Sequence, residues 1–364
     1  MKISGRHYRT LWPTARDTVR IIDQTRLPFE LAFLDLRCLE DAARAIRDMH
    51  VRGAPLIGAT AAYGLALALT RDPSDAGVDT AMRALLATRP TARNLGWALR
   101  RLERRIRRLP AGERADAAWQ EAQRICEEDV EHCVAIGRHG LTILERRAAI
   151  HDRPLRVLTH CNAGWLACID WGTALAPLYC AHDAGLEIEV WVDETRPRNQ
   201  GAALTAFELG AHGIAHTVIT DNLGGLLMQR GEVDLVIVGA DRVTACGDVC
   251  NKVGTYLKAL AARDNEVPFY VAFPSSTLDG SLESGREVPI EERSAREVTH
   301  VQGRADDGRL ASVQVVPDGS PALNLAFDVT PARLVTGFIT ERGVSTAGGA
   351  GIAALLASHA RVSA

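Results

Sequence analysis

An aspartate after one apolar run is the first candidate for chemistry in this sequence. Residues 235–238 are branched and apolar, the run breaks at Gly239, and Asp241 follows. A run of this kind, ended by glycine and followed by polar residues, is typical of a buried parallel strand that presents side chains at its carboxyl end. Burial there would raise the pKa of a carboxylic acid, so that Asp241 could donate a proton near neutral pH. A salt bridge to Arg242 and a helix N-cap are the structural alternatives.

A cysteine after another apolar run is the second candidate. The run LRVLT leads into His160, Cys161 and Asn162, and a helix of small residues is expected from about residue 164 to 184. A helix N-terminus lowers the pKa of a thiol and favours the thiolate. Cys161 would then serve as an acid/base group or a nucleophile. The structural alternative is a small buried residue.

A turn in the amino-terminal half has the character of an anion site. Arg52, Gly53 and Ala54 stand directly before Pro55, which suits the first turn of a helix. Backbone N–H groups at a helix N-terminus, together with an arginine, bind anions. The alternative is a tight turn beside a solvated arginine.

Four further residues are candidates for holding the same ligand. Arg89, which precedes Pro90, supplies a second guanidinium group, and Gln200 opens a predicted helix from which its amide could bind sugar hydroxyls. Asn251 and Lys252 are expected to begin a helix, where an amide and a cation would hold a phosphate. Ordinary N-capping by Asn251 is the alternative.

The elements that must position these residues are strand–helix units in the second half of the chain. Apolar runs alternate there with helical patterns, and a polar cluster follows each run. The runs are residues 155–159, 187–192, 216–220, 235–240 and 268–273. Strands and helices that alternate at this spacing indicate parallel crossovers and a doubly wound sheet. Because the polar clusters all follow the carboxyl ends of the strands, we expect one active site at that edge.

Residues 1–150 are predicted to form a mainly helical domain with short strands. VRIIDQTRLP and FELAFLDLR favour strands, and residues 39–49, 56–69, 95–109 and 113–148 have helical patterns. Six arginines in residues 95–109 lie mainly opposite the apolar positions, and we expect this helix to pair with the acidic cluster of the next one. The arginine face is interpreted as a solvated face or a subunit contact. A boundary at 151–154 would open a second domain, residues 151–364.

The end of the chain is predicted to be less regular. Residues 279–325 are rich in Gly, Glu and Arg, which favours a loop or flap with a short hairpin, and residues 331–343 are expected to form a last helix. VSTAGGAGIAALLAS is expected to be a helix with a glycine-rich start that does not follow a strand. Its glycines are therefore given no role in dinucleotide binding.

Composition excludes several classes of protein. The chain has 364 residues, 47% apolar and 24% charged, with a net charge of −3, which gives no reason to expect nucleic-acid or membrane binding. The N-terminus has no apolar signal region, and no apolar run approaches the ~20 residues of a membrane helix, so a cytoplasmic protein is expected. The eight cysteines include no C-x-x-C pair and are interpreted as free thiols. No metal is expected, because the cysteines lack a second ligand pair at the usual spacing, and neither ATP nor NAD is expected, because no P-loop or strand-linked dinucleotide motif occurs.

Taken together, the motifs resemble those of the methylthioribose-1-phosphate isomerases of methionine salvage, a superfamily that also holds the α, β and δ regulatory subunits of a translation-initiation exchange factor. The matching stretches are VRGAPLIGATAAYG, RPTARNL, LTHCNAGWL, DETRPRNQGAALTAFELG, ITDNLGGLLM, VGADRVTACGDVCNKVGTY, VPFYVAFPSSTLD and VPIEERS. The sequence departs from the family pattern at Ala163, Ala203 and Cys246, where Thr, Arg and Asn are common.

The resemblance implies a fold, an assembly and a site. The fold is an N-terminal, mainly helical domain and a C-terminal Rossmann-like domain, and the assembly is a homodimer. Cys161 and Asp241 correspond to the catalytic pair. The substrate contacts carried over by the resemblance are Arg52, Gly53, Ala54, Arg89, Gln200, Asn251 and Lys252.

The reaction implied is the isomerisation of 5-methylthioribose 1-phosphate to the corresponding ketose phosphate. Asp241 would protonate the ring oxygen, and Cys161 would move the C2 proton or assist a hydride shift. Isomerases of 5-deoxyribose 1-phosphate or ribose 1,5-bisphosphate are alternatives within the same chemistry. A non-catalytic regulatory subunit is the alternative from a different class.

Overall fold

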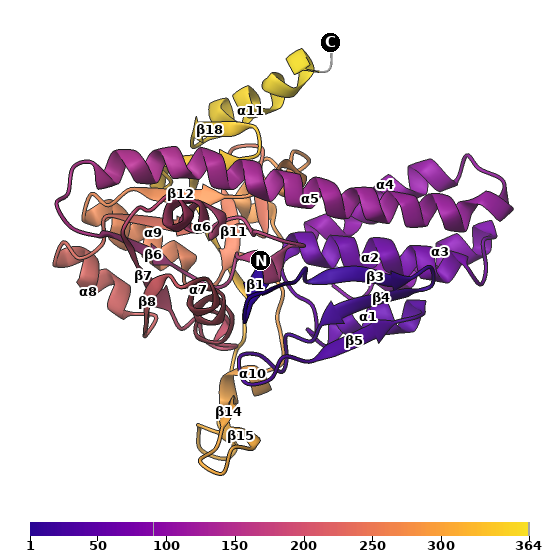
Figure 1. Ribbon diagram of the computed structural model, residues 1–364, viewed down its shortest axis with the longest axis horizontal. Coiled ribbons are helices and arrows are strands. Elements are labelled where there is room, and N and C mark those ends of the chain that lie inside the picture. Colours follow the sequence, from indigo (N-terminus) through magenta and orange to yellow (C-terminus); the bar gives the residue numbers. More distant parts are fainter. Residues whose placement is uncertain (90, 363–364) are drawn as a thin grey trace.

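Short strands open the chain and helices follow them (Figure 1). The computed structural model describes residues 1–89 and 91–362, so that Pro90, named above with Arg89, lies outside the described residues. The hairpin β1 (Lys2–Ile3) and β2 (Arg6–His7) precedes an antiparallel sheet of β3 (Leu11–Ala15), β4 (Thr18–Ile22) and β5 (Phe33–Leu36). The strands expected in VRIIDQTRLP and FELAFLDLR are confirmed as β4 and β5.

Helices make up the rest of the first half. They are α1 (Leu39–Arg47), α2 (Ala54–Leu69), α3 (Asp75–Leu86), α4 (Arg93–Ile106) and α5 (Ala111–Ala148). α2 is apolar around its whole circumference and lies at the centre, packed against the other four. A helix without a polar face has to be buried, and this is the environment that the sequence predicts for it.

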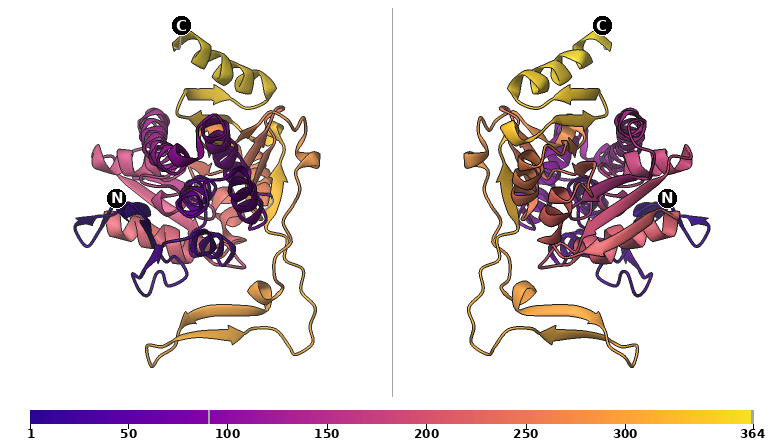
Figure 2. Two further views of the ribbon diagram at one scale, coloured as in Figure 1. Left: turned by 90° about the vertical axis from the view of Figure 1, so that its right-hand side faces the viewer. Right: turned by 90° about the vertical axis from the view of Figure 1, so that its left-hand side faces the viewer.

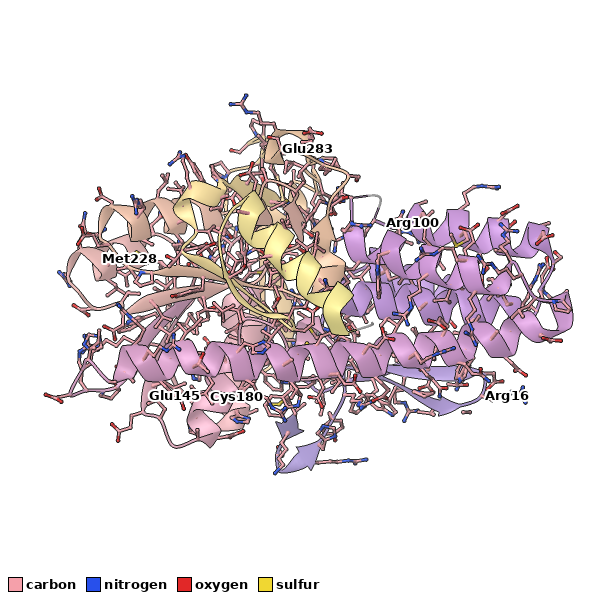
Figure 3. The ribbon with its side chains drawn as sticks, turned by 90° about the horizontal axis from the view of Figure 1, so that it is seen from above. Arg16, Arg100, Glu145, Cys180, Met228 and Glu283 are labelled. Atoms are coloured by element: carbon pink, nitrogen blue, oxygen red, sulfur yellow. The ribbon has the colours of Figure 1, made fainter. Side chains whose placement is uncertain are left out.

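The arginine-rich and acidic helices pair as predicted. On α4, Leu99 and Leu102 are buried in the core. Arg101, on the other face, forms ion pairs with Glu121 at 2.7 Å and with Glu128 of α5. α5 then continues along the second half of the molecule, where it contacts α6 and the sheet (Figures 1 and 3). Because α5 packs against both halves, the division into domains near residue 150 stays a prediction.

A seven-stranded sheet organises the second half. Its order is β18-β17-β12-β9-β6-β7-β8, and every neighbouring pair is parallel except β17 and β18. The strands are β6 (Leu155–Thr159), β7 (Ile188–Asp193), β8 (Ala215–Ile219), β9 (Leu235–Val238), β12 (Phe269–Ala272), β17 (Gly337–Thr340) and β18 (Gly343–Thr346). From β8 to β17 the strands follow the 3-2-1-4-5-6 order of the Rossmann fold. The predicted doubly wound sheet is confirmed.

Helices cover both faces of this sheet. α6 (Ala176–Asp183), α7 (Ala206–His212) and the end of α5 share one hydrophobic cluster with Leu235 and Ile237 of β9. α8 (Leu223–Gln229) and α9 (Thr255–Asp264) share another with Val236 and Val238 of the same strand. Successive side chains of a strand point to opposite faces, so a strand covered on both faces is apolar throughout.

A smaller sheet and a hairpin complete the chain. β10 (Arg242–Thr244), β11 (Val249–Lys252), β13 (Leu278–Asp279) and β16 (Phe327–Thr330) form a sheet of order β13-β10-β11-β16. After the short helix α10 (Arg296–Thr299), the hairpin of β14 (His300–Arg304) and β15 (Leu310–Gln314) projects from the body (Figure 2). The hairpin predicted within residues 279–325 is confirmed.

Two expectations for the carboxyl-terminal region are wrong. Residues 331–343 do not form a helix, because they contain β17, in which Phe338 and Ile339 enter the hydrophobic clusters on opposite faces of the sheet. The last helix, α11 (Gly349–Val362), does follow a strand, the antiparallel edge strand β18. Short apolar runs do not distinguish a strand from a helix until their neighbours are known. No helix in the described part of the chain is long and apolar enough to cross a membrane.

Candidate active site

Cys161 and Asp241 follow the two central strands of the sheet. Cys161 comes two residues after β6 and Asp241 three residues after β9, and these strands are parallel neighbours. Between them the strand order reverses, because the chain proceeds from β6 to β7 on one side and from β9 to β12 on the other. The crevice at such a reversal is where ligands bind in open α/β sheets. The topology therefore brings a thiol and a carboxyl group to one crevice.

Most of the predicted site residues line two adjoining cavities at this point. Cys161 and Asp241 border the same cavity. The other predicted residues on its wall are Arg52, Gly53, Ala54 and Asn251. A second cavity shares Ala54 and Asp241 and adds Arg89. The predicted residues thus come together from both halves of the chain, although Gln200 and Lys252 do not line these two cavities.

Cys161 does not lie at a helix N-terminus, so the environment expected for it is wrong. The helix expected from about residue 164 is only α6, and residues 165–167 form a single 3₁₀ turn. The backbone N–H groups of Trp165 and Leu166 donate to the buried carboxylate of Glu208, at 2.9 and 3.0 Å. These hydrogen bonds hold the 3₁₀ turn against a side chain from α7.

The backbone of Cys161 is held in an uncommon conformation. Its φ angle is +67°, in the left-handed region that few residues other than glycine adopt. Its N–H donates to Oγ1 of Thr195 at 2.8 Å, and its carbonyl accepts from Oγ1 of Thr205 at 2.7 Å. Strained residues that are held by their surroundings occur often at functional sites.

The thiol of Cys161 is buried, and no helix N-terminus stabilises its thiolate. Its Sγ donates to Oε1 of Gln200 at 3.4 Å. Burial raises the pKa of the Cys161 thiol, while the positive charges of Arg52 and Lys252 oppose that rise. The sequence-based expectation of a lowered thiol pKa is therefore wrong, because the helix dipole on which it depended is missing.

The Asp241 carboxyl group accepts no hydrogen bond from the residues that the structure describes. Its backbone N–H donates to the carbonyl of Cys250 at 2.9 Å. The structural alternative of a salt bridge to Arg242 fails, because the Arg242 guanidinium pairs with Asp279 at 3.3 Å. Burial raises the pKa of Asp241, and Lys252, Arg89 and Arg52 oppose the rise in that order. The direction agrees with that expected for a carboxylic acid that donates a proton.

The turn at residues 52–54 connects the helical half of the chain to the loop after β6. Arg52 is buried, and its guanidinium donates to the side-chain oxygen of Asn162 and, at 2.6 Å, to the Asn162 carbonyl. The alternative of a solvated arginine is thereby excluded. Gly53 has a φ of +96°, and a Cβ atom there would lie 2.5 Å from Cα of Ala167. No other residue fits this close approach.

Asn251 and Lys252 end a strand and do not begin a helix, which corrects the expectation. They belong to β11, which pairs on both sides, with β10 and with β16, and α9 begins only at Thr255. Pairing with Asp328 and Phe327 of β16 holds Asn251 and Lys252 extended against a local helical preference. The Asn251 amide donates to Oγ1 of Thr255 at 3.0 Å, but the N-cap of α9 is Gly254, so the alternative of N-capping by Asn251 is wrong.

The ammonium group of Lys252 is buried beside the ring of Phe327. Its Nζ lies 4.7 Å from the ring centre of Phe327 and makes no hydrogen bond or ion pair with any described residue. Burial lowers the pKa of Lys252, whereas Cys161 and Asp241 raise it. A buried cation without a counter-ion is available to an anionic ligand.

Glu291 is a site residue that the sequence analysis did not single out. Its carboxylate accepts from Arg89 at 2.7 Å and pairs with Arg293 at 2.8 Å, so the flap segment is tied to the helical half. The Nε of Arg89 is buried without a partner among the described residues. VPIEERS contains Glu291, but only the family resemblance drew attention to that stretch.

His160 is a second residue that the sequence analysis did not use. Its Nδ1 lies 2.8 Å from the Asp193 carboxylate, and its Nε2 lies 2.9 Å from the carbonyl of Val253. Both partners offer oxygen acceptors, so hydrogen bonds at both ring nitrogens hold the imidazole in place. It links the strand end that carries Cys161 to the turn after Lys252. Its only sequence signal was its position directly before the cysteine.

Two groups of side chains have ligating atoms within 4.8 Å of one another. They are Asp129, Cys133 and Cys168, and His160, Asp193 and Asp221. The protein itself uses both groups, because Asp129 accepts from the N–H of Ile169 and His160 pairs with Asp193. These contacts account for the clusters without a metal ion.

The comparisons with known proteins cover most of the chain. The model of the initiation factor 2 subunit family matches residues 50–347. A methylthioribose-1-phosphate isomerase of Methylorubrum extorquens is 63% identical over 363 residues, which is 99% of this chain and 100% of that protein. The protein of the same name from Paramagnetospirillum magneticum is 60% identical over 363 residues, again 99% of this chain and 100% of that protein.

Solved structures of two kinds resemble the fold. The 5-methylthioribose 1-phosphate isomerase of Pyrococcus horikoshii has a TM-score of 0.82 and 38% identity, with 96% of each chain covered. The delta subunit of translation initiation factor eIF-2B from A. fulgidus has a TM-score of 0.75 and 39% identity, with 93% of this chain and 96% of that chain covered.

Proposed function

We propose, because this chain belongs to the initiation factor 2 subunit family and to its methylthioribose-1-phosphate isomerases, that it converts 5-methylthioribose 1-phosphate into 5-methylthioribulose 1-phosphate. The enzyme is then an aldose–ketose isomerase of methionine salvage. The observation that carries the assignment of its residues is the meeting of Cys161 and Asp241 at the strand-order reversal, beside buried cations.

Asp241 is the general acid of the ring-opening step. In this substrate the anomeric oxygen carries phosphate, so the furanose cannot open to a free aldehyde as an ordinary aldose does. Cleavage of the C1–O4 bond therefore requires a proton on O4. A carboxyl group whose pKa burial has raised, and whose oxygens accept no hydrogen bond from the described residues, is suited to supply that proton.

Cys161 carries hydrogen from C2 to C1, or assists its direct transfer. In the proton route the thiolate removes the C2 proton to give an enol phosphate, and the resulting thiol returns a proton to C1. The C2 hydroxyl proton then passes to the Asp241 carboxylate, so both residues regain their initial states. In the hydride route C2 hydrogen moves directly to C1, and Cys161 remains a thiol. Its hydrogen bond to Gln200 supports the second route, whereas the charges of Arg52 and Lys252 support the first.

The phosphate is bound by the buried cations around the cavities. Lys252 has no counter-ion among the described residues, and Arg52 and Arg89 keep their guanidinium groups on the cavity walls. The helix α2 starts at the same wall, directly after Gly53. Guanidinium groups, an ammonium group and a helix N-terminus together match a phosphate dianion.

The C5 substituent is apolar. A third cavity, which shares Arg52 with the site and is bordered by Gln200, is lined by Leu27, Pro28, Phe29 and Leu204 among others. The one further arginine on its wall, Arg198, is paired with Glu297 at 2.8 Å. The wall is half polar, and its apolar side chains can contact a methylthio or deoxy substituent.

Turnover of three substrates tests this function. Purified protein is incubated with 5-methylthioribose 1-phosphate, 5-deoxyribose 1-phosphate and ribose 1,5-bisphosphate, and ketose phosphate is measured by NMR. We expect the highest kcat/KM for the methylthio compound. A protein that binds these sugar phosphates but converts none of them would instead be a regulatory subunit.

Assembly, location and division into domains follow the family as further proposals. We propose a cytoplasmic homodimer in which residues 1–150 and 151–364 form separate domains. Sedimentation at several protein concentrations tests the dimer, and the folding of each fragment on its own tests the domain boundary.

A further inference from the structure

A basic cleft lies beside the site, on the other side of Arg89. It encloses about 910 Å³ of open space between α4 and the small sheet. Its wall carries four arginines and one carboxylate. These are Arg89, Arg93, Arg100, Arg242 and Asp279. The cleft is separate from the cavity that holds Cys161, although Arg89 and Arg242 border both the cleft and the cavity beside Asp241.

The positive charge of the cleft is not balanced by its surroundings. Arg93 and Arg242 share Asp279, at 3.7 and 3.3 Å, and Arg89 pairs with Glu291. Arg100 makes no ion pair or hydrogen bond within residues 1–89 and 91–362. Guanidinium groups outnumber the carboxylates that reach them, and such an excess in a concave site attracts anions.

The position of Arg100 depends on a glycine one turn earlier in α4. A Cβ atom on Gly96 would lie 3.1 Å from Nη1 of Arg100, so the missing side chain gives the guanidinium room to fold back over the helix toward the cleft. Figure 3 shows Arg100 where the helical half meets the segment that carries Glu283. Arg100 is exposed, and its side chain lies on the wall of the cleft.

We propose that this cleft binds a phosphorylated small molecule at a second anion site, which shares Arg89 with the isomerase site. Arginine presents paired N–H donors that match phosphate oxygens, and the cleft offers several such groups around one volume. The net charge of −3 over the whole chain confines the attraction to this concave surface, which favours a small ligand over a nucleic acid. Arg89 places the bound anion in contact with the wall of the active-site cavity.

Calorimetric titration of the full-length protein with pyrophosphate at low ionic strength tests the site, and inorganic phosphate serves as a second probe. The wild type is compared with Arg100→Glu, with Arg104→Glu and with Lys252→Met. Arg104 is the matched control, because it is an exposed arginine of the same helix with no ion pair among the described residues. Lys252→Met removes the buried ammonium group that is proposed to bind the substrate phosphate.

We expect pyrophosphate to bind the wild type and Lys252→Met alike. Arg100→Glu should weaken binding at least about tenfold, and Arg104→Glu less than about twofold. The proposal is overturned if the wild type binds no pyrophosphate, if Arg100→Glu does not weaken binding or weakens it no more than Arg104→Glu, or if Lys252→Met abolishes binding. The last result would place the anion in the active-site cavity.

Discussion

The Sγ atom of Cys161 donates a hydrogen bond to Oε1 of Gln200 across a distance of 3.4 Å. An amide oxygen can accept this bond only while the sulfur keeps its proton. Together with burial, the contact favours the neutral thiol, against the pull of Arg52 and Lys252 toward the thiolate. The bond also joins the end of β6 to the segment after β7. Gln200, which is proposed to bind substrate, therefore favours the protonated form of Cys161, which is proposed to act on the substrate.

Replacement of Cys161 by serine should keep this bond and lose the chemistry. A hydroxyl group donates to the Gln200 amide as the thiol does, but it ionises much less readily. If Cys161 moves a proton, kcat should fall about 100- to 10,000-fold while substrate affinity changes little. Steady-state kinetics and calorimetry on the folded variant measure both quantities. Activity within tenfold of the wild type would exclude an acid/base role for the thiol.

Isotope transfer distinguishes the two routes for the C2 hydrogen. In heavy water, a proton route through Cys161 should place solvent deuterium at C1 of the product, because a thiol exchanges with solvent. NMR of the ketose phosphate after partial conversion measures this incorporation. Complete retention of the original hydrogen would favour the hydride route and leave Cys161 as a neutral thiol.

The activity of Asp241 should depend on pH in one direction. Burial raises the pKa of this group, and the acid form is the one that protonates O4. The value of kcat/KM should therefore decrease as the pH rises through that pKa. Asp241→Asn should lose about 100- to 10,000-fold in kcat and lack this decrease. The same pH limb in the Asn variant would assign the titration to another group.

Lys252→Met should weaken the binding of the substrate phosphate. The variant keeps the stem beside Phe327 but removes the ammonium group, which has no other counter-ion among the described residues. Loss of a charge-assisted contact raises the dissociation constant about 10- to 100-fold. Calorimetry with substrate measures it, and Lys2→Met, at an exposed position, is the control. Equal affinities of Lys252→Met and the wild type would remove Lys252 from the phosphate site.

Glu208→Ala should destabilise the segment after β6, which carries Cys161 and Trp165. The buried carboxylate accepts from the N–H groups of Trp165 and Leu166, from the Asn162 amide and from the Tyr179 hydroxyl. Its removal leaves buried donors without partners, at about 1–3 kcal/mol each. In urea unfolding, the free energy of unfolding should decrease by at least about 3 kcal/mol. The control variant Glu187→Ala, at an exposed position, should change it little. A loss no larger than in Glu187→Ala would show that water replaces the carboxylate.

The order of strands and helices in the second half could be predicted from local pattern. Val236 and its neighbours form an apolar run because both faces of the sheet are covered, and that pattern is visible in the sequence. Residues 331–343 could not be assigned in the same way. β17 is only four residues long, and a short apolar run acquires its extended form from the parallel neighbour β12 and the antiparallel neighbour β18.

By itself, the sequence determined which residue types stand at the strand ends and that their clusters share one edge, because the alternation of elements dictates parallel crossovers. Only the tertiary structure decided the state of those residues. A 3₁₀ turn bound by Glu208 stands where a helix was expected after Cys161. Pairing with β16 holds Lys252 extended beside Phe327. The pKa of a group and the partners of its hydrogen bonds depend on atoms that are distant in sequence, and local pattern carries no information about them.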